Sequence, residues 1–270
     1  MTQPLTLASF GYHDVTDDPT SSGFQRPAAL PFKLTPAMFT AHLDRIASAH
    51  RAPELIETVD LTQPGHHVLL TFDDGGKSAL QVADELARRG WKGHFFIITA
   101  RIGQQPFLGS AEIQQLRRGG HVIGSHSHNH PSLFRELTSQ RLLQEWRGSR
   151  DWLEQLLGEP VITASVPGGD ISERVMDSAA EAGFTYLFTS EPSVTPGRVS
   201  GCAILGRFVV KRSTSAARVG ELARLRGWGQ AMLVRRVKAG ARRLLPGLYR
   251  RYISHVTAGD AAAPQDAGRS

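Results

Sequence analysis

The stretch LLTFDDGG, residues 69–76, joins a strand-like apolar run to two adjacent carboxylates and two glycines. Apolar runs of this length, bounded by turn residues, are typical of buried strands. Two neighbouring acids at the end of such a strand are costly to bury unless they are paired, hydrogen-bonded or bound to a cation. A divalent cation would bind one carboxylate and leave the other free as a base. The alternative is an acidic loop tip in which Asp74 only caps the helix that follows.

Similar apolar runs recur on both sides of this stretch and alternate with segments of helical period. The expected strands are residues 5–12, 67–72, 93–99, 121–125, 161–166, 185–190 and 203–210. The expected helices begin at Thr35-Pro36 and cover residues 78–89, 111–118, 139–157 and 172–182. This alternation predicts an α/β fold with a parallel sheet and helices outside it. Periodicity does not separate a (β/α) barrel from an open doubly wound sheet, and in both folds function lies at the carboxyl ends of the strands.

A second polar cluster, GSHSHNHP at residues 124–131, also follows an expected strand and contains three histidines. Neutral imidazole is the commonest protein ligand of zinc and similar ions. On one helical turn His126 and His130 would face the same side, whereas in an extended segment His128 would share their face, so both pairings stay open. Two histidines and one aspartate are the donor set of a catalytic rather than a structural metal site. The alternative is a solvated loop with incidental histidines.

TFDDGG followed about fifty residues later by HSHNHP resembles the first two motifs of the polysaccharide deacetylases, carbohydrate esterase family 4 or the NodB homology group. The resemblance covers residues 5–210 and implies a distorted (β/α)7-type barrel. It implies that a divalent metal ion, zinc with nickel or cobalt as alternatives, is held by Asp74, His126 and His130. It makes Asp73 the catalytic base and His128 a non-ligand. The implied reaction is removal of acetyl groups from N-acetylated sugars of a polysaccharide or glycan intermediate by a metal-activated water.

The third motif of the family is altered in this sequence. It would place an arginine two residues before a proline, but residues 164–170 read ASVPGGD, so Ser165 stands where the arginine that orients the base is expected. Pro167 and Gly168 remain, and the Gly168 N–H is a candidate oxyanion donor. Asp170 adds a carboxylate to the same rim. A plain turn explains Pro-Gly-Gly equally well.

The histidine of the fifth motif, the family's usual proton donor, is absent from the last expected strand, AILGRFVV at residues 203–210. A donor is needed because the amine leaves only after protonation. His13 closes the first expected strand, as a histidine does in some family members, and is the substitute that we predict, with a turn histidine as the alternative. Glu191 and Arg207 are further candidates at the rim.

Length and composition fit one globular domain followed by a basic extension. The 270 residues are 40% hydrophobic and 21% charged, as in ordinary folded domains. We expect a barrel domain at 1–213, a basic helical extension at 214–257 and a disordered tail at 258–270. Arg207 to Arg251 contains 13 of the 31 Lys and Arg residues and one of the 25 acids, so nucleic-acid binding by the main domain is not predicted. The single cysteine excludes an internal disulfide and a thiolate zinc site.

The basic extension carries an amphipathic pattern that Pro246-Gly247 interrupts. Its apolar stripe consists of Leu233, Val237, Leu244, Leu248 and Tyr252. We expect the stripe to pack against the barrel while the arginines face water. The alternative is peripheral contact of residues 228–253 with an anionic membrane, which would suit a lipid-linked or exported glycan. The N-terminus lacks a signal-peptide pattern, and no long apolar run is present, so a cytoplasmic location is predicted.

Two other functions stay open from the sequence alone. The altered third motif and the missing fifth motif are compatible with hydrolysis of another non-peptide C–N bond, such as an amide, a ureide or a cyclic imide. The second is a non-catalytic glycan- or nucleic-acid-binding relic. A binding relic has no evident use for Asp73 beside an intact ligand set, so a metal-dependent sugar N-deacetylase is the leading prediction.

Overall fold

A computed structural model describes the backbone of residues 4–244 and the side chains of residues 4–237. The strands are β1 (Leu5–Tyr12), β2 (Pro53–Glu54), β3 (Gly65–Phe72), β4 (His94–Ile97), β5 (Val122–Ser125), β6 (Thr163–Ser165), β7 (Tyr186–Phe188), β8 (Gly197–Val199), β9 (Cys202–Leu205) and β10 (Phe208–Val209). The helices are α1 (Pro36–Ala47), α2 (Ala79–Ala87), α3 (Ser110–Arg118), α4 (Ser139–Leu157), α5 (Glu173–Glu181), α6 (Ala216–Ala223) and α7 (Trp228–Leu244).

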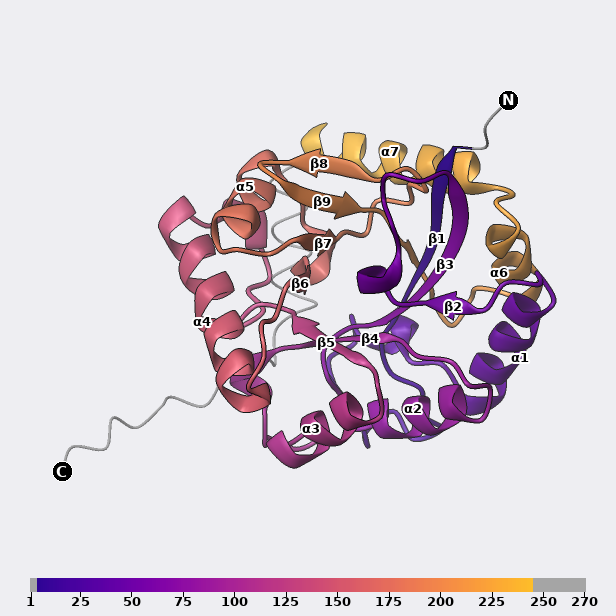
Figure 1. Cartoon of the computed structure of the whole chain (residues 1–270), viewed down its shortest axis with the longest axis horizontal. Helices are drawn as coiled ribbons and strands as arrows, with labels where there is room; N and C mark the ends of the chain where they lie inside the picture. The colour runs from indigo at the N-terminus through magenta and orange to yellow at the C-terminus, as the bar shows by residue number, and fades with distance from the viewer. Residues whose placement is uncertain (1–3, 245–270) are drawn as a thin grey trace.

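All strands join one curled sheet in the order β10-β1-β3-β4-β5-β6-β7-β9-β8, with β2 beside β3. Neighbours are parallel except for the antiparallel pair β8–β9. Helices α1 to α5 follow one another around the outside of the sheet (Figure 1). The predicted α/β fold with outer helices is therefore confirmed as a half-barrel, because no ladder joins the edge strands β8 and β10.

Each expected strand and helix is present, with one correction. The expected strand at 203–210 is two strands, β9 and β10, because Gly206-Arg207 carries the chain from one edge region of the sheet to the other. The short strands β2 and β8 and the helix α6 were not predicted individually. Several helix starts follow local capping rules: the Thr35 side chain accepts a hydrogen bond from the Met38 N–H at 3.2 Å, and Pro36 begins α1.

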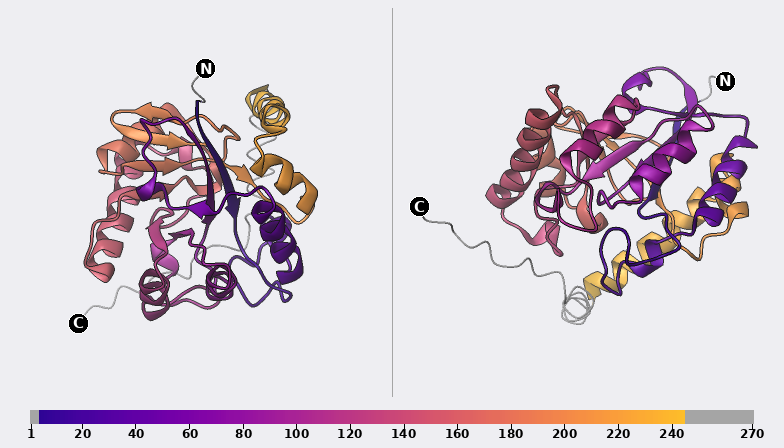
Figure 2. Two further views of the ribbon diagram at one scale, coloured as in Figure 1. Left: turned by 45° about the vertical axis from the view of Figure 1, so that its right-hand side comes forward. Right: turned by 90° about the horizontal axis from the view of Figure 1, so that it is seen from below.

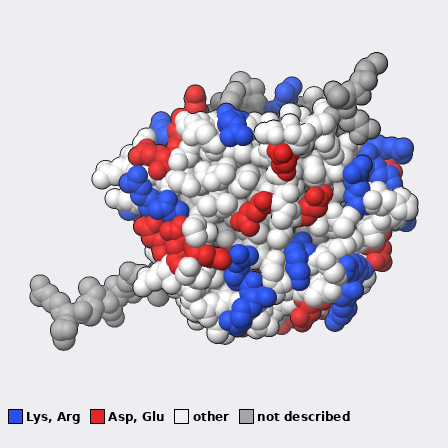
Figure 3. Space-filling view, in the orientation of Figure 1, with Lys and Arg blue, Asp and Glu red and all other residues white. Residues whose placement is uncertain are grey.

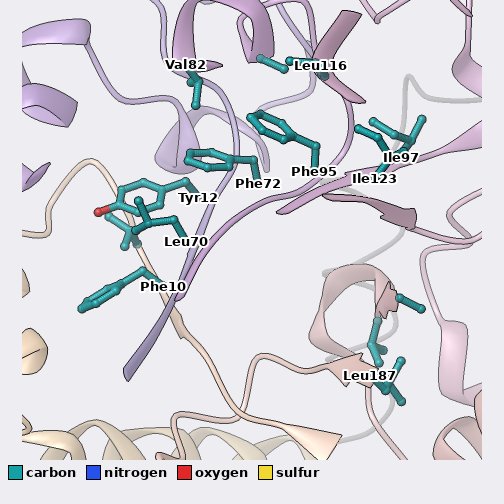
Figure 4. Close-up of a cluster of buried hydrophobic side chains, with 14 of the residues drawn as sticks. Phe10, Tyr12, Leu70, Phe72, Val82, Phe95, Ile97, Leu116, Ile123 and Leu187 are labelled. Carbon is teal, nitrogen blue, oxygen red and sulfur yellow. The ribbon is translucent and has the colours of Figure 1, made fainter. Parts of the chain in front are cut away.

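Alternation of side chains along the strands builds two separate cores. Outward-facing residues such as Phe10, Phe72 and Phe95 pack between sheet and helices (Figure 4). The opposite face buries Leu69, Phe96 and other apolar residues inside the curl, where Ile56 from the 3-10 turn Ile56–Thr58 joins them. The same face of β3 continues from Leu69 through Thr71 to Asp73, so the interior changes from apolar to charged towards the carboxyl ends of the strands.

Helix α7 docks on the barrel differently from our expectation. Arg235 Nε lies 2.8 Å from Glu191 Oε1, and Arg235 Nη2 donates to the Gly169 carbonyl at 2.7 Å. Leu233 and Val237 are 63% and 66% exposed, so the expectation that the apolar stripe packs against the barrel is wrong for these two residues. These polar contacts and the buried Trp228 at the start of α7, whose ring packs against Phe10 and Phe208, hold the helix instead. The described residues do not include Leu248, Tyr252, the break at Pro246-Gly247 or the predicted tail, and the side chain of Leu244 is not described either.

No helix within residues 4–244 is long and apolar enough to cross a membrane. On the face shown in Figure 3, basic and acidic side chains are interspersed and form no continuous basic field. The expected division at residue 213 falls just before α6, which packs against α1. This part of the basic extension is therefore in contact with the α/β unit.

Candidate active site

The two predicted motifs meet where β3 and β5 end. Asp74 Oδ1 lies 3.4 Å from His126 Nε2 and 3.8 Å from His130 Nε2. One potential ligand atom from each residue lies within 4.8 Å of the others. His128 points elsewhere, because its Nδ1 lies 2.8 Å from Thr99 Oγ1. Of the two histidine pairings left open by the sequence, the structure forms the one between His126 and His130.

These three side chains fit a divalent metal ion. His126 Nδ1 lies 2.9 Å from the Ser165 carbonyl oxygen, which can only accept, so Nδ1 carries a proton and Nε2, which faces Asp74, is the atom available to a metal. Burial lowers the pKa of His130 to about 3, which keeps its ring in the neutral form that a metal requires. Two imidazole nitrogens and one carboxylate, with open positions, suit zinc, nickel or cobalt better than a hard cation.

Three residues of the same two motifs have strained backbone conformations. Asp74, Ser127 and His130 have φ values of 76°, 63° and 55°, in the left-handed region that non-glycine residues seldom adopt. Each such residue costs about 1 kcal/mol or more and persists only where its surroundings enforce it. Here the Ser127 hydroxyl accepts from the His130 N–H at 3.0 Å, and Ser125 Oγ accepts from the Ser127 N–H at 3.1 Å. These bonds fix a backbone that aims the imidazoles at Asp74.

Arg207 holds the neighbouring carboxylate, Asp73. Its Nη1 and Nη2 donate to the two oxygens of Asp73 at 2.8 and 2.9 Å, the bidentate geometry that makes such pairs strong. Nη2 also donates to Ser165 Oγ at 2.7 Å, and Nη1 donates to Thr71 Oγ1 at 2.8 Å. The guanidinium is fully buried. The expectation that Asp73 lacks an arginine partner is therefore wrong: Ser165 stands where the motif has its arginine, and its hydroxyl binds the arginine that comes from position 207.

The connection between β9 and β10 brings Arg207 to this position. β9 pairs in parallel with β7 and β10 pairs in parallel with β1, so the chain keeps its direction as it crosses the open side of the sheet. Residues 206–207 connect β9 to β10, and the Arg207 N–H donates to the Glu191 carbonyl at 2.9 Å. A Cβ on Gly206 would lie 2.4 Å from the Ser193 carbonyl oxygen and 2.5 Å from that of Glu191. Only glycine fits this close approach. Since 42 residues separate Ser165 from Arg207, no local spacing signalled the replacement.

The charges around Asp73 keep it ionised. Burial raises the pKa of the Asp73 carboxyl, but the positive charge of Arg207 and the hydrogen bonds that it donates outweigh burial, so this pKa lies below its ordinary value. An ionised carboxylate beside the metal ligands can accept a proton. Asp73 thus has the charge state and position of a general base.

His13, the proposed proton donor, follows β1 and lines the same cavity as both aspartates. The ring packs against Phe32 with centroids 4.8 Å apart. Nδ1 is buried and has no hydrogen-bond partner among the described residues. The ring is therefore held in the site with one nitrogen uncommitted.

Some of the remaining rim residues line the cavity, and others hold the segments around it in place. The cavity has a volume of ≈ 1000 Å³ and is lined by Gly168 and Asp170, but not by Pro167 or Glu191. Gly168 has φ 59°, and its N–H makes no hydrogen bond to any described residue. Asp170 Oδ1 lies 3.2 Å from Arg135 Nε, while Glu191 binds Arg235 of α7. Gly168 thus keeps a donor available, whereas the two acids hold loops and a helix in place.

Fold and site together define an α/β half-barrel protein with a candidate Asp-His-His metal centre beside an arginine-held carboxylate. Residues 60–187 match the family model described as polysaccharide deacetylase. The resemblance of the two motifs to the polysaccharide deacetylases is thereby confirmed over this part of the chain.

Relatives of known name share part of the chain. A peptidoglycan-N-acetylglucosamine deacetylase of Bacillus cereus is 31% identical over 126 residues, which cover 46% of this chain and 56% of that protein. The peptidoglycan-N-acetylglucosamine deacetylase PgdA of Listeria monocytogenes is 27% identical over 157 residues, covering 57% and 32% respectively. The matches thus span about half or less of the length of these relatives.

Solved structures share the fold over most of the described chain. A polysaccharide deacetylase from Bacillus cereus has a TM-score of 0.69 at 19% identity and covers 81% of this chain and 69% of its own. IcaB from Ammonifex degensii has a TM-score of 0.68 at 20% identity, with 82% and 98% covered. At these identities the likeness concerns the fold alone.

Proposed function

We propose that the protein is a metal-dependent hydrolase that removes the acetyl group from an N-acetylated sugar. The observation that carries this proposal is the Asp73–Arg207 ion pair beside the cluster of Asp74, His126 and His130, at the bottom of a cavity open to solvent. The names of the relatives agree with it, since both act on N-acetylglucosamine in peptidoglycan.

The metal ion would be held by Asp74, His126 and His130, and it would supply Lewis-acid polarisation of the acetamide and activation of water. Asp73 takes the proton of the attacking water on a carboxylate oxygen, and Arg207 keeps that carboxylate ionised and correctly rotated. The Gly168 N–H donates to the acetyl carbonyl oxygen as negative charge develops there.

The leaving amine needs a proton, and His13 is the group that supplies it. Its ring faces the same cavity as Asp73, and its Nδ1 is uncommitted among the described residues. A base and an acid on opposite sides of the scissile C–N bond are what amide hydrolysis requires. The products are acetate and a free amino sugar. The predicted cytoplasmic location remains a proposal.

The test is acetate release from a panel of soluble N-acetylated sugars by protein loaded with zinc, nickel or cobalt. We expect release by the parent, a loss of at least ~100-fold for Asp73→Asn, and full activity for the matched control Asp84→Asn on the exposed face of α2. If the metal-loaded parent releases no acetate from any sugar, or if Asp73→Asn is as active as the parent, the proposal is wrong. Ureides and cyclic imides would then be the substrates to try.

A further inference from the structure

The exposed large apolar side chains of the described chain gather around the mouth of the active-site cavity. They are Leu30, Leu233, Val234 and Val237, between 45% and 66% exposed. Single exposed apolar residues are ordinary, but a cluster of them marks an interaction surface. Leu30 lies in the turn Leu30–Phe32, and the other three lie on α7, the two segments that flank the cavity. In Figure 2 the segment after β1 lies beside α7.

The outer walls of the cavity are apolar as well. Ala28, Ala29 and Pro31 line one side, and Ala231 and Val234 line the other. These side chains offer no hydrogen bonds to sugar hydroxyls, and burying hydroxyls without partners costs free energy. Polar side chains also lie away from the catalytic end, among them Lys211, Arg218 and Gln230. The apolar part of the walls suits a hydrocarbon chain, and the basic side chains beside it suit an anionic group.

The charge at the mouth is positive. The acids that line the cavity besides Asp74 each face a cation: Asp14 with Lys33 at 3.4 Å, Asp73 with Arg207 and Asp170 with Arg135. Lys211 and Arg218 also line the cavity, and Arg236 is exposed on α7 beside the apolar side chains. Basic side chains next to exposed apolar ones are the composition that binds anionic bilayers.

We infer that this mouth docks on an anionic membrane surface and that the substrate is the sugar headgroup of a lipid-linked glycan. This inference rests on the proposed function. Leu30, Leu233 and Val237 enter the headgroup region, Arg236 faces anionic lipid, and the hydrocarbon chain runs between the residue 27–32 segment and α7. The amide of the sugar then reaches Asp73 while the lipid stays in the bilayer.

Flotation of the metal-loaded full chain with lipid vesicles tests the surface without requiring catalysis. The two vesicle types are pure phosphatidylcholine and phosphatidylcholine mixed with phosphatidylglycerol. We expect binding to the anionic vesicles, weakened by added salt. Leu233→Asn/Val237→Asn should reduce it at least ~10-fold, and Arg236→Gln should reduce it on anionic vesicles. Matched controls are Ala87→Asn at the last residue of α2 and Arg88→Gln at the residue that follows it, both exposed and away from α7, and these should bind like the parent.

The outcomes separate the surface from the chemistry. The inference is supported if the α7 variants lose vesicle binding while the α2 variants keep it, even if no acetate is released from soluble sugars. If the parent releases acetate but binds neither vesicle type, the inference is overturned and the proposed function stays intact. Equal binding by parent and α7 variants also overturns it. A dimer that loses its association with Leu233→Asn/Val237→Asn, in a chain that binds no vesicles, would assign the surface to a second copy instead.

Discussion

Replacement of Arg207 by methionine removes the cation from Asp73 while keeping a side chain of similar length. Asp73 is only 7% exposed, so its carboxylate would be left buried without its ion-pair partner. Breaking a buried pair in this way costs about 3–5 kcal/mol of unfolding free energy. The two further hydroxyls that accept from the guanidinium, on Thr71 and Ser165, also lose their donor. We expect the variant to be destabilised by that amount at neutral pH.

The pH dependence has a definite sign. In the parent the pKa of Asp73 lies below its ordinary value, so this group stabilises the fold above its unfolded pKa of ~3.9 and loses that effect as the pH falls through the folded pKa. Without Arg207 the desolvation of the carboxyl prevails, and its pKa rises above ~3.9. The free energy of unfolding of the parent should therefore exceed that of the variant by a growing amount as the pH rises from acid towards neutral.

Two measurements check the reasoning. Urea unfolding of metal-loaded protein at several pH values reports the stability difference, and the pH profile of kcat/KM for acetate release reports the base. We expect the acid limb of the profile to move to higher pH in Arg207→Met, with kcat reduced more than KM is raised. Ser165→Ala is the control: it removes one neutral acceptor and should cost about 1 kcal/mol without moving the limb. An Arg207→Met protein within about 1 kcal/mol of the parent and with an unmoved acid limb would refute the role assigned to this arginine.

Further predictions concern the proton donor, the metal site and the connection between β9 and β10. His13→Gln should lower kcat about 10²-fold or more; a kcat equal to that of the parent would exclude His13 as the acid. Chelation should abolish acetate release, with zinc, nickel or cobalt restoring it, and His126→Ala should fail to retain stoichiometric metal in elemental analysis, whereas His50→Ala should retain it. Gly206→Ala should cost at least about 2 kcal/mol in urea unfolding, because its Cβ would meet the Ser193 carbonyl oxygen at 2.4 Å; a stability equal to that of the parent would show that the chain relaxes there.

Local patterns in the sequence predicted most of the secondary structure. The predicted β1 at residues 5–12 and α4 at residues 139–157 match the observed bounds. Continuous apolar runs indicate strands that are buried on both faces, and capping residues indicate where a helix begins, so both signals lie within a few residues of what they describe. The prediction failed at residues 203–210, where an apolar run with strand composition contains the crossing at Gly206-Arg207 from the ladder with β7 to the ladder with β1.

The sequence by itself determined the strand-helix alternation and the residues of both motifs, because each depends on neighbours a few positions apart. Only the tertiary structure decided that His126 pairs with His130, that the exposed side of α7 is its apolar one, and that Arg207 holds Asp73. The last contact spans 134 positions. It exists because the sheet curls until the strand ends of β3 and β6 and the connection from β9 to β10 face one another, so the guanidinium reaches Asp73 from a different part of the chain.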